Sequence, residues 1–108
     1  MIQLRVPILG NVSAGFPKSS EGYEDHPINL QDLLVTRPAA TFFFRVVGDD
    51  LRDQGVPGGA VLVVDRSLSL KPGRLAVVEQ DGVFIVRRLL AQDSATICGI
   101  VTAAIVRL

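Results

Sequence analysis

The sequence predicts a mostly β domain with one short helix and an extended N-terminal arm. From residue 41 onward, several apolar runs are rich in the β-branched and aromatic residues that strands favour. Two of these runs are separated only by Asp81-Gly82, which is the strongest short-range signal for a β-hairpin. Residues 10–27 are instead rich in Gly, Ser, Pro and charge, which is typical of an exposed segment.

The predicted elements follow in order along the chain. Residues 1–27 form the arm and residues 28–108 the folded domain. The apolar spacing in INLQDLLV (28–35) favours a short helix, which the following Pro38 would end. Strands are predicted over 41–47 (TFFFRVV), 61–65 (VLVVD), 75–80 (LAVVEQ) and 83–89 (VFIVRRL), and 96–108 (TICGIVTAAIVRL) form one long strand or two short ones.

Composition excludes several classes of protein. With 108 residues, 48% of them hydrophobic and 20% charged, the chain is long enough for one modest core and is not expected to be disordered. Its 11 basic and 11 acidic residues cancel, which argues against direct nucleic-acid binding, since such binding depends on clustered Lys and Arg. No apolar run approaches the ~20 residues that span a bilayer.

The sequence also argues against metals, cofactors and disulfides. The lone Cys98 cannot form an internal disulfide, and its apolar surroundings indicate a packing role. No Cys/His cluster has metal-ligand spacing, and the N-terminus makes a poor signal peptide. We therefore expect a cytoplasmic protein without a metal or cofactor.

One corner of the predicted sheet raises a functional question. The strand over 41–47 ends abruptly in Gly48-Asp49-Asp50, which places two adjacent carboxylates at a strand end. Asp49 is expected to cap the turn, since Asp favours such positions. Paired carboxylates could also suggest acid–base work or a cation site, but the rest of an oxygen-ligand set is absent.

The order of four segments resembles the C-terminal domain of the LexA/UmuD self-cleaving serine peptidases, and the UmuD type most closely. The segments are SAGFPKSSEGYEDHPINLQDLLV, ATFFFRVVGDDLRDQGVPGGAVLVVDRSL, GRLAVVEQDGVFIVRRL and TICGIVTAAIVRL, which together cover nearly the whole chain. The resemblance implies strongly bent sheets, one short helix and an N-terminal arm that carries a cleavage site.

In that family the chain cuts its own arm between a small residue and a glycine, here Ala14-Gly15. The nucleophile is a serine directly after Gly-Asp, and its base is a neutral lysine on the hairpin. Asp50 and Arg87 occupy these two positions. Arginine stays protonated at any accessible pH and cannot act as a base. The resemblance therefore implies a peptidase that has lost its catalytic dyad.

Two hypotheses follow from these departures. First, Asp50 and Arg87 form a partly buried salt bridge across the former active site. Second, a strand and loop that the family carries after its lysine hairpin are missing, because Leu89-Leu90 runs through AQDSA directly into TICGIVT. This shortening would remove one wall of the cleavage cleft and change the sheet near the C-terminus.

Other polar residues have simpler interpretations. His26 has no recognisable catalytic partner at a fixed spacing. Ser67 and Ser69 follow a strand, where hydroxyls usually form turns; either would be a substitute nucleophile only in an unfamiliar site.

UmuD-like proteins act as homodimers that bind a Y-family polymerase and the RecA filament during the SOS response. The resemblance implies an inactive accessory subunit of that kind in translesion DNA synthesis. The apolar C-terminal run supports a dimer, because such a strand needs cover on its outer face or edge. Two alternatives remain: a substrate cut in trans at Ala14-Gly15 by an active relative, and an active peptidase that uses an unrecognised nucleophile.

Overall fold

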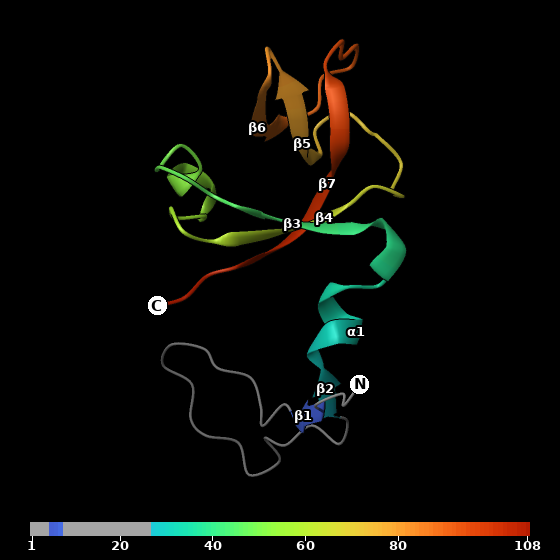
Figure 1. The fold of residues 1–108 in the computed structure, drawn as a ribbon, viewed down its shortest axis with the longest axis vertical. Helices are drawn as coiled ribbons and strands as arrows, with labels where there is room; N and C mark the ends of the chain where they lie inside the picture. Colours follow the sequence, from blue (N-terminus) through green and yellow to red (C-terminus); the bar gives the residue numbers. More distant parts are fainter. Residues whose placement is uncertain (1–4, 8–26) are drawn as a thin grey trace. The chain divides into compact units, whose positions relative to one another are not determined.

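The computed structural model of the protein describes residues 5–7 and 27–108 (Figure 1). These residues belong to two compact units, one ending at Thr36 and the other comprising Arg37–Leu108.

The first unit contains two very short strands and one short helix. Strand β1 (Arg5–Pro7) pairs antiparallel with β2 (Pro27–Asn29), and α1 (Leu30–Leu34) follows at once. The helix starts here because the Asn29 side-chain oxygen accepts hydrogen bonds from the first backbone N–H groups, at 3.0 and 3.3 Å. The predicted helix is thus confirmed but begins later than expected, and the β1–β2 pairing had no signal in the sequence.

The second unit is one five-stranded antiparallel sheet with the order β3-β4-β7-β5-β6. Its strands are β3 (Thr41–Arg45), β4 (Val61–Asp65), β5 (Leu75–Gln80), β6 (Val83–Arg88) and β7 (Thr96–Ile105). Short 3-10 helices cover Pro38–Ala40 and Arg52–Gln54. The mostly β prediction is confirmed, and the C-terminal run forms one long strand rather than two.

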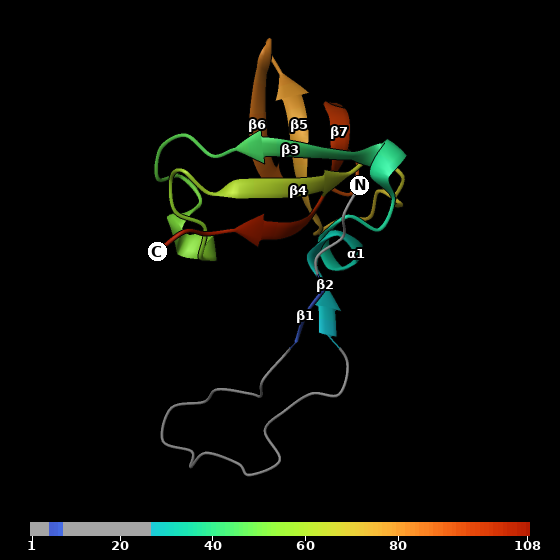
Figure 2. The same cartoon turned by 60° about the horizontal axis from the view of Figure 1, so that its bottom comes forward.

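Strand β7 belongs to both halves of this sheet. Its first part pairs with β5 and its second part with β4, and the register shifts once in each ladder, between Val77 and Val78 and between Val63 and Val64. Such irregularities bend a strand and increase its twist. Figure 2 shows the result, with β3 and β4 running across the direction of β5 and β6. The strongly bent sheet expected from the resemblance is therefore present.

Two apolar clusters lie against this sheet. One contains Leu62, Val64 and Val77 together with Leu51 and Val56 of the loop between β3 and β4, and Cys98 packs against it as predicted. The other is formed by Ala76, Val78, Leu89 and Ile100. Because neighbouring residues of β5 belong to different clusters, the two clusters lie on opposite faces of β5.

The hairpin between β5 and β6 has the predicted turn. Asp81 and Gly82 connect the two strands, and both have positive φ angles, 54° and 78°. This is the backbone that two-residue hairpins require and that Asp-Gly accommodates easily. Within the described part of the chain, no helix is long and apolar enough to cross a membrane.

The close packing of β7 at Gly99 predicts that a larger side chain there destabilises the protein. A Cβ at this position would lie 2.7 Å from Val64 Cγ1 and 3.1 Å from the Asp65 carbonyl oxygen. We expect Gly99→Ala to lower the free energy of unfolding by ~1–3 kcal/mol, because overpacking forces neighbouring atoms to shift. Urea unfolding measures the effect. In a Val64→Ala background the added cost of Gly99→Ala should shrink, and a fully additive cycle would contradict this explanation.

Candidate functional site

The corner that carries Asp50 lies just beyond β3. The chain stays beside β4 as far as Val46, whose N–H donates to the Ala60 carbonyl and whose carbonyl accepts from Gly59, both at 2.8 Å. It then reverses at Gly48, which has a φ of +83° that favours glycine. Gly58 packs directly under this turn, since a Cβ there would meet the Gly48 carbonyl oxygen at 2.7 Å.

The two carboxylates of the corner have different surroundings. The Asp49 carbonyl accepts the Arg52 N–H at 3.1 Å, and the Asp49 side chain forms an exposed ion pair with Arg52 at 3.3 Å. This agrees with a turn-forming role. The Asp50 side chain is exposed and has no hydrogen bond or ion pair with any residue that the structure describes.

Asp50 lines a cavity of about 250 Å³ between the two ends of the sheet. Apart from Asp50 and Arg45, the lining is apolar and comes from the end of β3 and the turn after it, from β4 and β5, and from β6: Phe44, Val46, Val47, Leu51, Leu62, Val77, Phe84, Ile85 and Val86. The Arg45 guanidinium donates to the Gly59 carbonyl at 3.2 Å. The cavity thus lies beside the corner that carries Asp50.

Arg87 does not reach this cavity. Its register partner on β5 is Ala76, which belongs to the apolar cluster on the face of β5 turned away from the cavity. The next pair along the two strands, Val77 and Val86, faces the cavity that Asp50 lines. The expected salt bridge between Asp50 and Arg87 is therefore wrong, because strand alternation places the two side chains on opposite faces of the sheet.

Arg87 instead binds Asp93 in the loop between β6 and β7. Its Nη1 and Nη2 lie 2.6 and 2.8 Å from the two carboxylate oxygens, a bidentate pair. Asp93 also accepts the backbone N–H groups of Leu90 and Ala95, each at 3.1 Å, and its side chain is only 8% exposed. The guanidinium of Arg87, helped by these N–H groups, holds the pKa of the Asp93 carboxyl far below its usual range.

Asp93 therefore closes the short connection between β6 and β7. One carboxylate fixes the end of β6, the loop and the approach to β7. Sequence reasoning missed it, because Asp93 in AQDSA has the composition of an ordinary polar loop.

Arg88, the last residue of β6, contacts the 3-10 helix that follows the corner. Its Nη2 donates to Gln54 Oε1 at 3.2 Å, and its Nη1 donates to the Gly73 carbonyl at 3.0 Å. Gln54 belongs to the 3-10 helix shortly after Asp50. Arg88 stays protonated and cannot act as a base.

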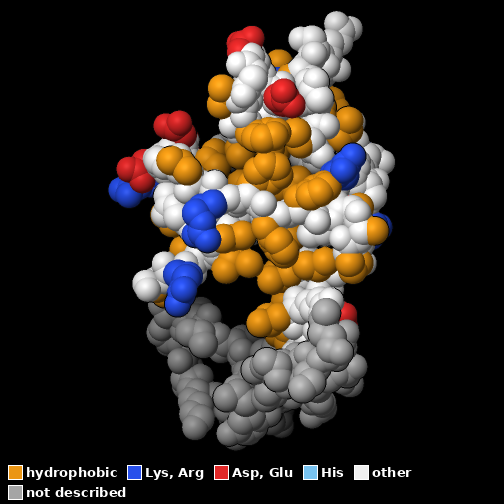
Figure 3. Space-filling model, viewed as in Figure 1, with side chains coloured by type: hydrophobic (Ala, Val, Ile, Leu, Met, Phe, Trp, Pro, Cys, Tyr) orange, Lys and Arg blue, Asp and Glu red, His pale blue; other side chains and the backbone are white. Residues whose placement is uncertain are grey.

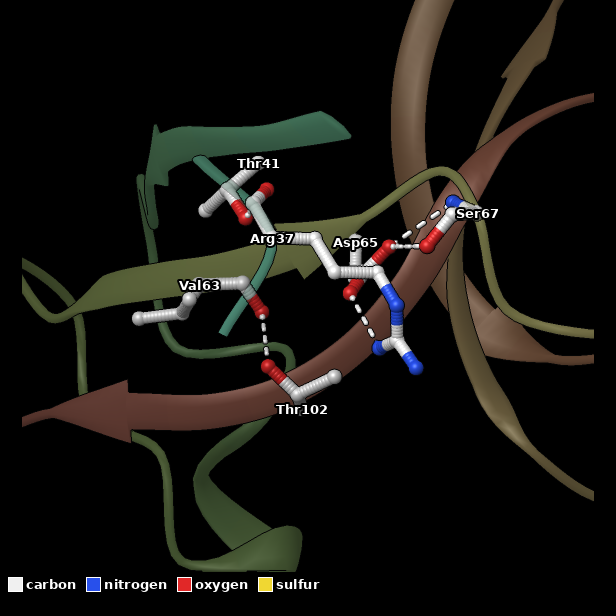
Figure 4. Close-up of polar contacts among 6 residues, drawn as sticks. All are labelled: Arg37, Thr41, Val63, Asp65, Ser67 and Thr102. Carbon is white, nitrogen blue, oxygen red and sulfur yellow. Dashed lines mark hydrogen bonds and ion pairs between the residues drawn. The ribbon is translucent and has the colours of Figure 1, made fainter. Parts of the chain in front are cut away.

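A second buried carboxylate, Asp65, lies at the end of β4 (Figure 4). It accepts from Ser67 N at 2.7 Å, from Ser67 Oγ at 2.6 Å and from Arg37 Nη1 at 3.3 Å. The Ser67 hydroxyl and N–H, with Arg37, lower the pKa of the Asp65 carboxyl. Ser67 therefore forms a turn, as predicted, and Ser69 is exposed in the loop beyond it.

The remaining candidates are the residues of the N-terminal arm and a possible metal site. Ala14, Gly15 and His26 lie outside the described residues. Among residues 5–7 and 27–108, no group of three or more His, Cys, Asp or Glu side chains could hold a metal ion.

Comparison with known proteins agrees with this geometry. Residues 7–97 match the family model described as Peptidase S24-like. The chain is 44% identical over 82 residues to Protein MucA of Salmonella typhimurium, which covers 76% of this chain and 56% of MucA. It is 42% identical over 77 residues to Protein ImpA of the same organism, which covers 71% of this chain and 53% of ImpA.

A more distant relative is the LexA repressor of Xylella fastidiosa (strain M23), 36% identical over 86 residues, which covers 80% of this chain and 40% of the repressor. The chain spans about half the length of the curated relatives it matches.

The ion pair between Arg87 and Asp93 predicts an asymmetry in stability. Arg87→Gln should destabilise the protein clearly more than Arg52→Gln, because only Arg87 leaves a nearly buried carboxylate without its partner. Arg87→Lys should lie between the wild type and Arg87→Gln, since lysine keeps the charge but not the bidentate geometry. Thermal unfolding measures all three variants, and equal losses for Arg87→Gln and Arg52→Gln would contradict the asymmetry.

The same carboxylate predicts a dependence on pH. Because folding lowers the pKa of Asp93, its contribution to stability is fully present above its unfolded pKa of about 4 and is lost as pH falls below it. We expect Asp93→Asn to lower stability at neutral pH and to flatten the loss of stability in acid. Urea titrations at several acidic pH values measure the two slopes. If the unfolding free energies of the wild type and Asp93→Asn fell in parallel with decreasing pH, Asp93 would have no special role.

Proposed function

The chain belongs to the Peptidase S24-like family, of the UmuD/LexA type, and from this membership we propose that it is a catalytically inactive, UmuD-like accessory subunit. The observation that carries the proposal is the separation of Asp50 from Arg87. Of the two positions that the resemblance assigns to the nucleophile and the base, Asp50 lines the cavity and Arg87 forms a bidentate ion pair with Asp93 on the other face of the sheet.

The chemistry around Asp50 supports the loss of peptidase activity. A nucleophile needs a base within hydrogen-bond reach, at about 2.6–3.2 Å, that can accept a proton near neutral pH. Among the residues that the structure describes, the only other charged side chain that lines the cavity is Arg45, which stays protonated and donates to the Gly59 carbonyl. No described group there can activate a hydroxyl, a water molecule or the Asp50 carboxylate.

The proposed role is that of a homodimeric subunit in the SOS response and translesion DNA synthesis. It would bind a Y-family DNA polymerase and the RecA filament in the cytoplasm without cutting its own arm, residues 1–27. The apolar outer face of the sheet supports the homodimer. Phe43 on β3 and Ile105 on β7 point to the same face of β4 and are 57% and 40% exposed. An exposed apolar face of this kind is typical of a protein interface.

The absence of a usable dyad predicts that the chain does not cut itself. Purified protein kept at alkaline pH, a condition that favours a neutral base, should retain its intact mass for days. The paired variant Asp50→Ser/Arg87→Lys should also stay intact, because position 87 faces Asp93 rather than the corner. A cut at Ala14-Gly15 in the wild type would reopen the enzyme interpretation. A cut in the paired variant alone would show that position 87 can reach the corner.

Mixing the protein with an active relative tests the other alternative. Cleavage at Ala14-Gly15 only in the mixture would identify the chain as a substrate that is cut in trans. An active family member incubated alone at the same pH is the positive control.

The apolar outer face predicts the oligomeric state. At tens of micromolar, light scattering should give the mass of a dimer, and Ile105→Glu should shift it to a monomer because a charge cannot be buried there without a partner. Leu70→Glu is the matched control, since Leu70 is 56% exposed in the loop between β4 and β5 and belongs to neither β3 nor β7. A monomeric wild type, or equal effects of both substitutions, would overturn the assignment of the face.

A further inference from the structure

A very short stretch of chain joins the two compact units. The units divide between Thr36 and Arg37. On the N-terminal side, Val35 still belongs to the end of α1, because its N–H donates to the Gln31 carbonyl at 2.8 Å. On the other side, Arg37 is already bound to the end of the sheet. Thr36 alone therefore separates the end of α1 from the contacts of Arg37.

The first residue pair of β3 and β4 holds both the side chain and the backbone of Arg37 (Figure 4). Thr41 and Asp65 are register partners. Asp65 Oδ2 accepts a hydrogen bond from Arg37 Nη1 at 3.3 Å, and Thr41 Oγ1 donates to the Arg37 carbonyl at 2.7 Å. The Ala40 N–H donates to the same carbonyl at 3.0 Å. Arg37 is thus fixed at its guanidinium and at its carbonyl.

The two sides of the ion pair differ in how firmly they are held. The Asp65 side chain is 5% exposed and the Arg37 side chain 55%. The N–H and hydroxyl of Ser67 both donate to Asp65 Oδ1, at 2.7 and 2.6 Å. The carboxylate therefore stays in place when Arg37 leaves, whereas a half-exposed guanidinium moves into water at little cost. A fixed anion and a mobile cation suit a contact that opens and closes.

Opening this contact lengthens the link between the units. The Ala40 carbonyl accepts the Arg66 N–H at 2.9 Å, which keeps Ala40 beside the end of β4 even without Arg37. The residues that can be released are therefore Arg37–Ala39. Three extended residues add ~10 Å to a link that otherwise consists of Thr36.

The length of the link matters because the first unit carries an exposed apolar surface. Leu30 and Leu33 of α1 are 55% and 60% exposed. Figure 3 shows that hydrophobic side chains also gather on the face of the second unit that this view presents. Exposed apolar surfaces are typical binding sites. The length of the link decides which of them, on the same chain or on another, the helix can reach, and at what effective concentration.

We propose that the ion pair between Arg37 and Asp65 is a clasp that sets the length of the link between the two units. With the clasp closed, Thr36 alone connects α1 to the sheet, and the first unit has a limited range of positions. When Arg37 leaves Asp65, the link extends to Ala39 and this range increases. The clasp acts whether or not the chain cuts its own arm, so its failure and the failure of the proposed function are distinguishable.

Amide hydrogen exchange of the full-length protein, followed by NMR, tests the clasp. Arg37→Gln removes the ion pair. Arg66→Gln is the matched control, since Arg66 also lies at this end of the sheet but stacks over Phe42, 5.0 Å from the ring centroid. The Ala40 amide should exchange about two- to five-fold faster in Arg37→Gln, as expected for loss of a half-exposed ion pair, and at the wild-type rate in Arg66→Gln. The amides of β5 should stay protected in both variants, which shows that the sheet remains folded.

The ¹⁵N relaxation of α1 tests the length of the link separately. The ratio of the transverse to the longitudinal relaxation rate of the α1 amides should fall in Arg37→Gln, because a longer link lets the helix tumble more independently of the sheet. Arg66→Gln should keep the wild-type ratio. In about 1 M salt the difference between the wild type and Arg37→Gln should shrink, because salt screens a half-exposed ion pair.

Three results would overturn the clasp. One is equal Ala40 exchange in the wild type and Arg37→Gln. Another is faster exchange with no change in the relaxation of α1, which would show that the ion pair only stabilises the 3-10 helix over Pro38–Ala40. The third is the same change in Arg66→Gln as in Arg37→Gln, because Arg66 makes no contact with Asp65 through its side chain in the described structure.

Discussion

The fold depends on one strand, β7, that pairs with both halves of the sheet. It can do so only by bending where it passes β4, and Gly99 makes that passage possible because no side chain fits between it and Val64. Two results follow from the bend. It gives each half of the sheet its own direction, and it brings the distant edges β3 and β6 close enough for Phe44 and Phe84 to touch. The cavity beside Asp50 is thus a product of the curvature.

Much of this fold could be predicted from the sequence, because its signals are local. The five strands of the main sheet lie where β-branched and aromatic runs predicted them, and the Asp81-Gly82 turn has the backbone that those residues favour. The position of β7 between β4 and β5 was not predictable, since it depends on pairing between residues far apart in the chain. The β1–β2 pair was missed for the same reason, and each of its strands is too short to show a pattern.

In the candidate site, too, the features with local sequence signals were predictable and the long-range contacts were not. The corner at Gly48 and the carboxylates beside it were found from the sequence, because a strand end and a turn leave local signals. The link from Asp50 to Arg87 came from their positions in the family pattern and not from any local property. The link is wrong because side chains alternate along β6, so Arg87 points to the face opposite that of its neighbour Val86. Asp93, the true partner of Arg87, lies in a loop whose composition reveals nothing about its contacts.

Asp93 also affects the proposal that the chain lacks a catalytic base at position 87. A lysine acts as a base only if burial in apolar surroundings lowers its pKa toward neutrality. At position 87 the nearly buried Asp93 carboxylate does the opposite, because its hydrogen bonds favour the charged form and raise the pKa of the Arg87 guanidinium further. A lysine there would be held protonated by the same carboxylate. The surroundings of position 87 thus suit an ion pair that closes a short loop, and they do not suit a neutral lysine.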